Sequence, residues 1–352
     1  MEKLFKKYHI DGDIVAIGVS GGADSMALAL MAAEQLAPLN KKIVALTVDH
    51  GLRPSSADEA QYVAQVMAQF GIEHHILPWI GEKPTTGIEE AARQVRYRLI
   101  CDWCFDHDIN CVMMAHHLQD QAETFLIRLQ RGSGLTGLCA MREFEDMDGF
   151  CILRPFLDKN PEELKAYLQQ KGVRWVEDES NENEQYLRNK IRKFLPILEK
   201  QIGISAEDIC QTVSRLQSSE DYIEKNVEKF FNKEVFFEIG DVYYCNYKAF
   251  CELHHEMQFR VLAQILCDMY IPRAEKILNL QRMLQMPDFK GTTLGKKEIF
   301  IYDKKIWFVP ELSFKRKAYR KDWAEFVVRM PKYKNKKLPA KVKYVITRAV
   351  ME

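Results

Sequence analysis

Two patterns of hydrophobic and polar positions alternate along the first half of the chain. Short apolar runs predict buried strands at 14–19, 43–49, 73–77 and 111–115. Helical patterns between and after them predict helices at 26–36, 56–70, 86–107 and 120–131. The third of these helices opens on a capping box, Thr86-x-x-Glu89. The alternation predicts an α/β fold with a doubly wound parallel sheet, in which the loops after Val19, Val48 and Ala115 face one crevice.

The second half of the chain predicts helices and then a small α+β module. We expect an added strand at 151–154 and helices at 161–171, 205–231, 248–270 and 272–286, with a further helix that begins at 187–195 and is interrupted by Pro196. The long helix at 205–231 has the pattern of a connector between domains. Hairpins are expected around Gly240-Asp241 and Asp303-Lys304, and a loop at 291–294. The domain limits predicted from these elements are 1–200, 201–234, 235–317 and 318–352.

Composition changes this picture little. The 352 residues are 47% hydrophobic and 28% charged, which is typical of a globular chain with two or three domains. No apolar run approaches the roughly 18 residues of a membrane span, and Met1 to His9 lacks the apolar region of a signal peptide. We therefore expect a cytoplasmic protein without a membrane partner. The 9 cysteines are irregularly spaced, which indicates reduced thiols.

Charge is unevenly distributed along the chain. The net charge is 0, but the segment from Lys315 to Glu352 holds 13 Lys and Arg against 3 Asp and Glu. This segment therefore carries +10 and the remainder −10. A basic end on an acidic body favours a polyanionic partner such as nucleic acid, although a solvated tail without a partner explains it equally well.

The segment Ser20-Gly21-Gly22-Ala23-Asp24-Ser25 joins the first predicted strand to the first helix. Backbone N–H groups at such a junction suit a phosphate, and the glycines allow close approach. Asp24 adds a carboxylate for Mg²⁺. The segment lacks the ending of a Walker A loop and the third glycine of a dinucleotide fingerprint. It resembles the SGGxDS signature of the PP-loop ATP pyrophosphatases, with an ordinary strand-to-helix turn as the alternative.

A second polar stretch runs from Met114 to Thr124, where a strand enters a helix. His116, Asp120 and Glu123 stand at spacings of four and three, and the two carboxylates share a helix face. This pattern is compatible with a zinc or manganese site, with a general base beside a magnesium ligand, or with a polar helix start that Asp120 caps.

A third stretch begins at Glu177-Asp178-Glu179-Ser180-Asn181 and continues into a helix. Arg188 and Arg192 lie four apart on one face of that helix. Such a pair suits phosphate groups, although a charged helix start explains it as well.

The motifs occur in a fixed order that carries more information than any one of them. They are Ser-Gly-Gly-x-Asp-Ser, Val-Asp-His-Gly-Leu-Arg, Ala-Arg-x-x-Arg-Tyr, His-His-x-x-Asp-Gln-Ala-Glu-Thr, Arg-Gly-Ser-Gly, Arg-Pro-Phe and Asp-x-Ser-Asn…Arg-Asn-x-Ile-Arg. This succession resembles the tRNA(Ile)-lysidine synthetase family over about Val15 to Arg192. From Lys193 onward only the layout is similar.

The resemblance implies a ligase that uses ATP, L-lysine and a tRNA(Ile) with a CAU anticodon. The wobble cytidine is adenylated at its C2 oxygen, pyrophosphate leaves, and the lysine ε-amine then displaces AMP to form lysidine. It also implies that 1–200 is the ATP-binding catalytic domain, 235–317 a tRNA-binding domain and 318–352 a reduced C-terminal domain.

Site roles follow from this chemistry as expectations. The phosphates of ATP are assigned to Ser20, Gly21, Gly22, Ala23, Asp24 and Ser25. Asp24 and Asp120 are the Mg²⁺ candidates, and Asp120, Glu123 and Arg188 the catalytic ones. Glu123 is expected to hold the lysine amine and accept its proton, with Asp120 as the alternative. His116, Arg131 and Arg192 are expected to contact the base, phosphates or tRNA backbone.

Departures from the family keep other hypotheses open. Gln119 stands where many family members carry Asp, and the chain is shorter than the long members. Cys101 and Cys104 form a lone CxxC, which PP-loop tRNA thiolases use for an iron–sulfur cluster and which is otherwise structural. A thiolase, a catalytically inactive tRNA-binding relative and a metallohydrolase that uses His116, His117 and Asp120 are the alternatives. The sequence leaves the oligomeric state open, a homodimer included.

Overall fold

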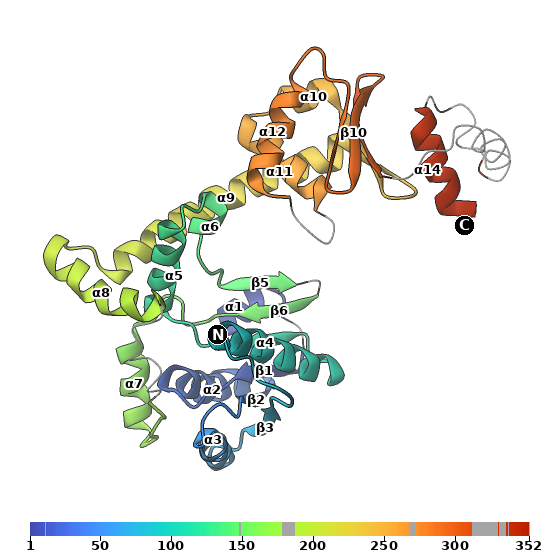
Figure 1. The fold of residues 1–352 in the computed structure, drawn as a ribbon. Helices are drawn as coiled ribbons and strands as arrows, with labels where there is room; N and C mark the ends of the chain where they lie inside the picture. The colour runs from blue at the N-terminus through green and yellow to red at the C-terminus, as the bar shows by residue number, and fades with distance from the viewer. Residues whose placement is uncertain are drawn as a thin grey trace. The chain divides into compact units, whose positions relative to one another are not determined.

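The computed structural model describes residues 1–10, 12–147, 149–177, 187–267, 272–311, 330, 336 and 338–351. Contacts divide the chain into two compact units, Met1–Ser218 and Ser219–Glu352. The division falls inside helix α9 (Ala206–Glu234), which contributes its first half to unit 1 and its second half to unit 2. Figure 1 shows the elements of both units.

Unit 1 is built on a six-stranded sheet in the order β3-β2-β1-β4-β6-β5. Its strands are β1 (Ile14–Gly18), β2 (Lys42–Asp49), β3 (Glu73–Pro78), β4 (Cys111–Met113), β5 (Phe144–Met147) and β6 (Phe150–Leu153). Every neighbouring pair is parallel except β5 with β6. The predicted parallel α/β sheet is therefore confirmed, and β5 is an antiparallel edge strand that the pattern did not predict.

Helices cover both faces of this sheet. Helices α1 (Glu2–Lys7), α2 (Ala23–Leu36), α3 (Ser56–Gln69), α4 (Ile88–Asp106) and α7 (Pro161–Gln170) pack against it. Helices α5 (Leu118–Gln130) and α8 (Leu187–Ile202) share a separate core with the start of α9, and unit 1 also contains α6 (Leu135–Leu138) and the short 3-10 turn η1 (Ala37–Leu39). Alternate side chains of β1 point to opposite faces, as a strand requires. Val15 and Ile17 pack in one core with α2, α3 and α7, whereas Ala16 packs in a second core with α4.

Two predicted helix boundaries in unit 1 are wrong. Helix α4 does not begin on a capping box at Thr86, because its N-cap is Gly87, which adopts the left-handed φ of 64° and provides no side-chain cap. Helix α8 is not interrupted at Pro196 but continues through it to Ile202. Pro196 removes one backbone hydrogen bond, but Ile191 and Leu195 are buried in a core shared with α5 and α9, which holds the helix together.

Unit 2 contains a five-stranded antiparallel sheet in the order β7-β8-β11-β10-β9. Its elements are β7 (Val235–Glu238), β8 (Val242–Asn246), α10 (Tyr247–Cys251), α11 (His255–Leu266), α12 (Ala274–Leu284), β9 (Thr292–Leu294), β10 (Lys297–Tyr302), β11 (Lys305–Pro310) and α14 (Ala340–Met351). Both predicted hairpins are confirmed. The loop predicted at 291–294 is wrong because Thr292 to Leu294 pair with β10. The helix predicted at 248–270 is wrong because α11 begins on its own N-cap, where the side chain of His254 accepts from the Glu256 N–H.

Each face of the unit 2 sheet has its own core. One core joins the second half of α9 with α10, α11 and α12, and it contains the fully buried Phe250 and Phe308. The other joins Trp307 and Val309 of β11 with Val342 and Ile346 of α14. The basic end of the chain therefore includes a helix that belongs to a hydrophobic core, which a wholly solvated tail would not. Residues 315–329, 331–335, 337 and 352 of that end lie outside the described residues.

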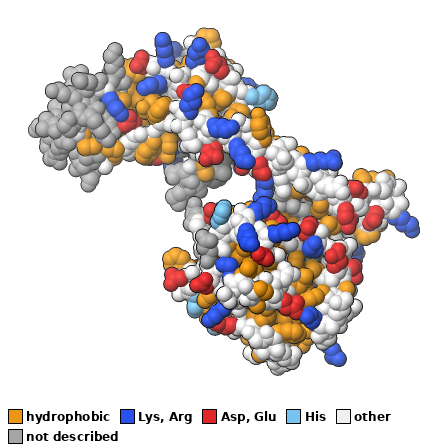
Figure 2. All heavy atoms as spheres, turned by 180° about the vertical axis from the view of Figure 1, so that it is seen from behind, with side chains coloured by type: hydrophobic (Ala, Val, Ile, Leu, Met, Phe, Trp, Pro, Cys, Tyr) orange, Lys and Arg blue, Asp and Glu red, His pale blue; other side chains and the backbone are white. Residues whose placement is uncertain are grey.

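Among the residues that the structure describes, no helix is long and apolar enough to cross a membrane. On the face of the molecule drawn in Figure 2, basic and acidic side chains are interspersed over the described surface. The net charge of −10 outside the basic end therefore does not correspond to a continuous acidic surface on that face.

Candidate active site

The loop between β1 and α2 folds back tightly on itself. Gly21 has a φ of 86°, which favours glycine, and a Cβ there would lie 3.3 Å from Val63 Cγ2. The Gly21 carbonyl accepts a 2.9 Å hydrogen bond from the Val176 N–H. Gly22 is extended and is the N-cap of α2. Both glycines therefore allow the tight turn of the backbone that the sequence predicts at this loop.

The hydroxyl of Ser25 forms hydrogen bonds within this loop. Ser25 Oγ accepts from the Ser20 N–H at 3.1 Å and donates to the Gly22 carbonyl at 3.0 Å. Ser25 is buried, whereas Ser20 is exposed. The N–H groups at the start of α2 have no partners within the helix, so the loop can receive an anion at the positive end of the helix dipole.

The order of the strands brings a second loop beside the first. From β1 the chain moves outward through β2 and β3, and it then returns to add β4 on the other side of β1. The adjacent strands β1 and β4 thus flank the point at which the winding reverses, where ligands bind in open α/β sheets. Asp24 follows β1, and the loop after β4 carries His117 and leads to Asp120 in α5.

Asp24, His117 and Asp120 meet at this point. His117 Nε2 lies 3.5 Å from Asp24 Oδ2 and 3.4 Å from Asp120 Oδ2. Asp120 also accepts from the His117 backbone N–H at 3.1 Å, so it caps α5 as one interpretation of the sequence proposed. The structure therefore joins residues that lie almost a hundred positions apart, and His117 is the imidazole between the two carboxylates.

The two carboxylates have opposite electrostatic environments. Burial raises the pKa of Asp24, with a further contribution from the nearby Asp120. Burial acts in the same direction on Asp120, but His117 and Arg188 outweigh it and hold the pKa of that carboxyl below its usual value. Asp24 Oδ1 is buried and has no hydrogen-bond partner. An oxygen in this state favours a cation or a donor from a substrate.

Glu123 holds two arginines from another helix. Its side chain is fully buried, and its oxygens accept from Arg188 Nε at 2.6 Å and from Arg192 Nε at 2.7 Å. Arg188 also donates to Asp120 Oδ1 at 3.0 Å. The predicted pair of arginines on one face of α8 thus meets the predicted pair of carboxylates on one face of α5. Both oxygens of Glu123 are engaged, so the arrangement suits a clamp that positions guanidinium groups better than a free proton acceptor.

The other residues predicted for the site differ in position. His116 directly precedes His117, and burial lowers its pKa to about 3, which keeps its ring neutral. His116 Nδ1 is buried and has no hydrogen-bond partner. Arg131 is exposed at the opposite end of α5, roughly 16 Å along the helix from Asp120, and does not join the cluster.

From the sequence, His117 was considered only as a residue of the metallohydrolase alternative, and His116 was the histidine expected to contact the substrates. The adjacent His116 and His117 are chemically alike, and only the direction of the chain at the start of α5 distinguishes them. The sequence did contain one indication, because His117 directly precedes a predicted helix. The N-cap side chain of such a helix lies at the same edge of the sheet as the glycine loop after β1.

Mg²⁺ fits the donors present at this edge. In the part of the chain that the structure describes, no group of three or more His, Cys, Asp or Glu residues could hold a metal by itself. Mg²⁺ is commonly held by one or two carboxylates together with substrate phosphates. Asp24, with its unpartnered Oδ1, and Asp120 offer such a partial set beside an anion-binding loop.

The CxxC pair lies in α4. Cys104 is buried and Cys101 is half-buried, and both thiols are free. Burial raises the pKa of both, that of Cys104 to about 12. A cluster needs thiolates, so this environment favours the structural interpretation of the pair.

The chain resembles known proteins in sequence and in fold. The PP-loop domain family matches residues 1–198. A tRNA(Ile)-lysidine synthase of Bradyrhizobium sp. strain BTAi1 is 42% identical over 56% of this chain and 55% of that protein, so the match spans about half of the relative's length. A second, from Wolbachia pipientis wMel, is 34% identical over 85% of this chain and 71% of that protein.

Among solved structures, the U34-tRNA thiolase NcsA of Methanococcus maripaludis with its [4Fe-4S] cluster matches with a TM-score of 0.51. It is 18% identical over 58% of this chain and 71% of that one, a likeness of fold alone. The match to the Wolbachia pipientis protein extends beyond the PP-loop domain and through much of unit 2. The chain belongs to the tRNA(Ile)-lysidine synthase family, and its unit 1 contains the PP-loop domain of that family.

Proposed function

We propose that this protein ligates L-lysine to C2 of the wobble cytidine of a CAU-anticodon tRNA(Ile), consuming ATP and releasing AMP and pyrophosphate. The product, lysidine, pairs with A instead of G, so the tRNA reads AUA and not AUG. The observation that carries the proposal is the meeting of the Ser20–Ser25 loop with Asp24, His117 and Asp120 at the winding reversal of the sheet. The substrates named here are those of the family to which the chain belongs.

The first step transfers an adenylyl group. The C2 oxygen of cytidine forms a bond to the α-phosphorus of ATP, and the bond to pyrophosphate breaks. The N–H groups at the start of α2 and the Ser20 hydroxyl bind the phosphates there. Asp24 and Asp120 would hold Mg²⁺, which supplies positive charge to the departing pyrophosphate.

The second step forms the C–N bond. The lysine ε-amine attacks C2 of the adenylated cytidine, the C2–O bond breaks, AMP leaves, and the amine loses its protons. In water this amine is protonated, with a pKa of about 10.4. Arg188 and Arg192, which Glu123 holds beside Asp120, favour its neutral form and balance the charge of the AMP leaving group. Asp120 is the candidate proton acceptor because its side chain remains 13% exposed, whereas the side chain of Glu123 is fully buried.

The test is incubation of the protein with ATP, labelled L-lysine and unmodified CAU-anticodon tRNA(Ile). Label should enter the tRNA only with ATP present, and nuclease digestion should yield lysidine at the wobble position. A tRNA that differs only by a wobble uridine is the control. Absence of label, with pyrophosphate release also absent, would refute the proposal. The cytoplasm, where tRNA is processed, is the proposed site of action. A homodimer stays a prediction for light scattering to test.

A further inference from the structure

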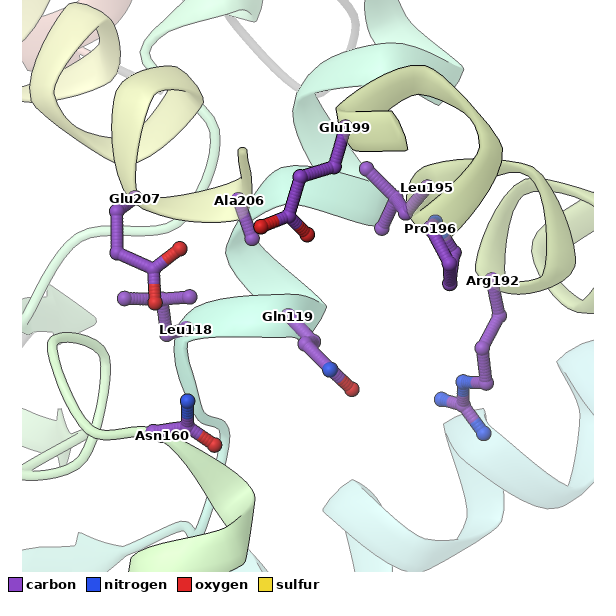
Figure 3. Close-up of a pocket in the computed structure, with 9 residues that line it drawn as sticks. All are labelled: Leu118, Gln119, Asn160, Arg192, Leu195, Pro196, Glu199, Ala206 and Glu207. Atoms are coloured by element: carbon purple, nitrogen blue, oxygen red, sulfur yellow. The ribbon is translucent and has the colours of Figure 1, made fainter. Parts of the chain in front are cut away.

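Helix α5 carries Asp120 and Glu123, so its orientation decides where these two carboxylates point. Its start meets α8 and the starts of α7 and α9 around a pocket of about 170 Å³, which is lined by Arg192 and therefore belongs to the reaction site (Figure 3). A buried apolar core joins α5 with α8 and α9. Because apolar contacts are non-directional, this core holds the helices together without fixing how α5 is rotated about its axis.

One side chain on another face of α5 pairs with the backbone of Met141. Gln121 Nε2 donates to the Met141 carbonyl at 2.7 Å, and Gln121 Oε1 accepts from the Met141 N–H at 2.9 Å. Gln121 follows Asp120 directly, but at 3.6 residues per turn its side chain points about 100° away around the helix axis. Gln121 is buried, so loss of this pair of hydrogen bonds would leave polar groups unsatisfied.

Arg128 makes a second attachment on the same face of α5. It stands about two turns after Gln121, and its Nη1 donates to the carbonyls of Gly137 and Ala140 at 2.8 and 2.9 Å. Ala140 has a φ of 49°, a strained value for a residue other than glycine, which the surrounding contacts must hold. Two attachments two turns apart, both to residues 137–141, restrain the rotation of α5 about its axis.

The segment of residues 137–141 is in turn held by α9. Gln217 Nε2 donates to the carbonyls of Cys139 and Met141 at 2.8 and 2.9 Å. The Met141 carbonyl therefore accepts from one amide of α5 and from one amide of α9. Gln217 lies in the half of α9 that belongs to unit 1, so all of these contacts are within one unit.

The Arg-Pro-Phe motif attaches the same region to the sheet. Arg154 directly follows β6, and its buried side chain donates from Nη1 to the Arg142 carbonyl at 2.9 Å. Phe156 of the same motif forms a parallel bridge with His117, the N-cap of α5. The motif therefore ties both the end of the 137–141 segment and the start of α5 to the end of one strand.

We propose that Gln121 and Gln217 are positioning residues for the reaction of unit 1. Through Met141 they fix the rotation of α5, and with it the places of Asp120 and Glu123. The inference rests on the proposed function and adds to it two residues that act on the reaction through α5. A side-chain oxygen lies roughly 5–6 Å from the axis of its helix, so a rotation of about 10° moves it by about 1 Å. A displacement of this size at a reaction site can cost about 100-fold in rate.

Gln217→Leu is the decisive variant, because it removes the hydrogen bonds from α9 to this segment and changes no atom of α5. We expect single-turnover pyrophosphate release from ATP and tRNA to fall roughly 10-fold in Gln217→Leu and roughly 100-fold in Gln121→Leu. The KM for ATP should stay within about twofold, because the Ser20–Ser25 loop belongs to other elements. The exposed Gln211→Leu of α9 and Gln130→Leu of α5 are matched controls and should keep the wild-type rate.

Further variants show whether the two residues act together. If both act through Met141, Gln121→Leu/Gln217→Leu should be no slower than Gln121→Leu alone, whereas two independent losses would multiply. Gln217→Lys supplies an ammonium donor for both carbonyls and should return to within about threefold of the wild-type rate. Gln217→Glu has the shape of glutamine but no donor in its ionised form, so it should stay slow.

The outcomes separate positioning from stability and from the proposed function. Circular dichroism and urea unfolding first show which variants are folded. A folded Gln217→Leu with the wild-type rate would overturn the proposal, and so would single losses that multiply in the double variant or a loss confined to the KM for ATP. If Gln217→Leu unfolds, equal rates of Gln217→Lys and Gln217→Glu would overturn it. If the wild type itself releases no pyrophosphate with tRNA, the proposed function fails instead.

Discussion

Arg188 Nε donates to Glu123 Oε2 over 2.6 Å, although the two residues are 65 positions apart in the chain. The Glu123 carboxylate is fully buried, while the side chains of Arg188 and Arg192 remain 34% and 36% exposed. The acidic partner is thus withdrawn from solvent, and the arginines extend from it toward the surface. This relationship decides how the two helices α5 and α8 present charge to a substrate.

Replacement of Glu123 by Gln separates a positioning role from a proton-transfer role. If Glu123 positions the arginines, Glu123→Gln lowers the free energy of unfolding by about 1–3 kcal/mol. This is less than the usual cost of breaking a fully buried ion pair, because both arginines are partly exposed to solvent. The substitution then also slows pyrophosphate release, a step before lysine is needed. Urea unfolding and single-turnover pyrophosphate release measure these effects, with the exposed Glu90→Gln as control. Normal stability and pyrophosphate release, with loss of lysine transfer alone, would restore Glu123 as the base.

Arg188→Lys should fail at the same step. Arg188 uses two different nitrogens, one on Glu123 and one on Asp120, and a single ammonium group cannot reproduce that fork. We expect pyrophosphate release to fall roughly 100-fold or more, comparable to the loss of one preorganised donor. Arg131→Lys, at the far end of α5, is the control and should keep the wild-type rate. Full turnover of Arg188→Lys would mean that only a general positive charge is required.

Asp24→Asn should abolish adenylation and spare tRNA binding. The substitution keeps the shape of the side chain but removes the charge beside the loop, where Asp24 Oδ1 has no protein partner. Pyrophosphate release should drop roughly 100-fold or more, whereas tRNA affinity in a filter-binding assay should change less than about twofold. The exposed Asp58→Asn serves as the charge-matched control. A normal rate in Asp24→Asn would remove this residue from the phosphate and metal site.

Unit 1 should lose stability as the pH falls below about 6.5. Burial lowers the pKa of His116 to about 3 and those of His50 and His74 to about 4, while in the unfolded chain these rings titrate near 6.5. Between these values the unfolded state binds more protons, so the stability present above pH 6.5 decreases toward pH 4. The midpoints of urea unfolding between pH 7.5 and pH 5 measure how steeply the stability changes with pH. His74→Gln can keep a bond to Thr47 and should make the slope shallower; an identical slope would contradict the assignment.

Charge at the basic end is better tested by substitution than by truncation. Deletion from Lys315 would also remove α14 and expose Trp307 and Val309, so loss of tRNA binding could reflect unfolding. We expect Lys315→Gln/Arg316→Gln/Lys317→Gln to weaken tRNA binding and to reduce the slope of log affinity against log salt by roughly 0.7–0.9 for each phosphate that the variant no longer binds. The same three-charge change at Lys3, Lys6 and Lys7 of α1 is the control. An unchanged slope would assign tRNA binding to other parts of the chain.

Local pattern was sufficient for much of the fold and for part of the site. Strands β1, β2 and β4 appear in the sequence as short apolar runs, and their burial on both faces of a parallel sheet is the reason. The rule that ligands bind at the carboxyl ends of such strands placed the loop at Asp24 and the stretch at Asp120 on one edge. Helical spacing likewise put Arg188 and Arg192 on one face of α8.

By itself the sequence determined the α/β architecture, the glycine loop and the family, because these depend on local periodicity and on motifs that are continuous in the chain. Only the tertiary structure decided that Glu123 holds both arginines and that His117 stands between Asp24 and Asp120. It also decided that α8 continues through Pro196 and that α14 completes a core. Periodicity shows which residues share a face of one element, but it does not show which other element packs against that face. In all these cases packing between segments that are distant in the sequence outweighs the local secondary-structure preference.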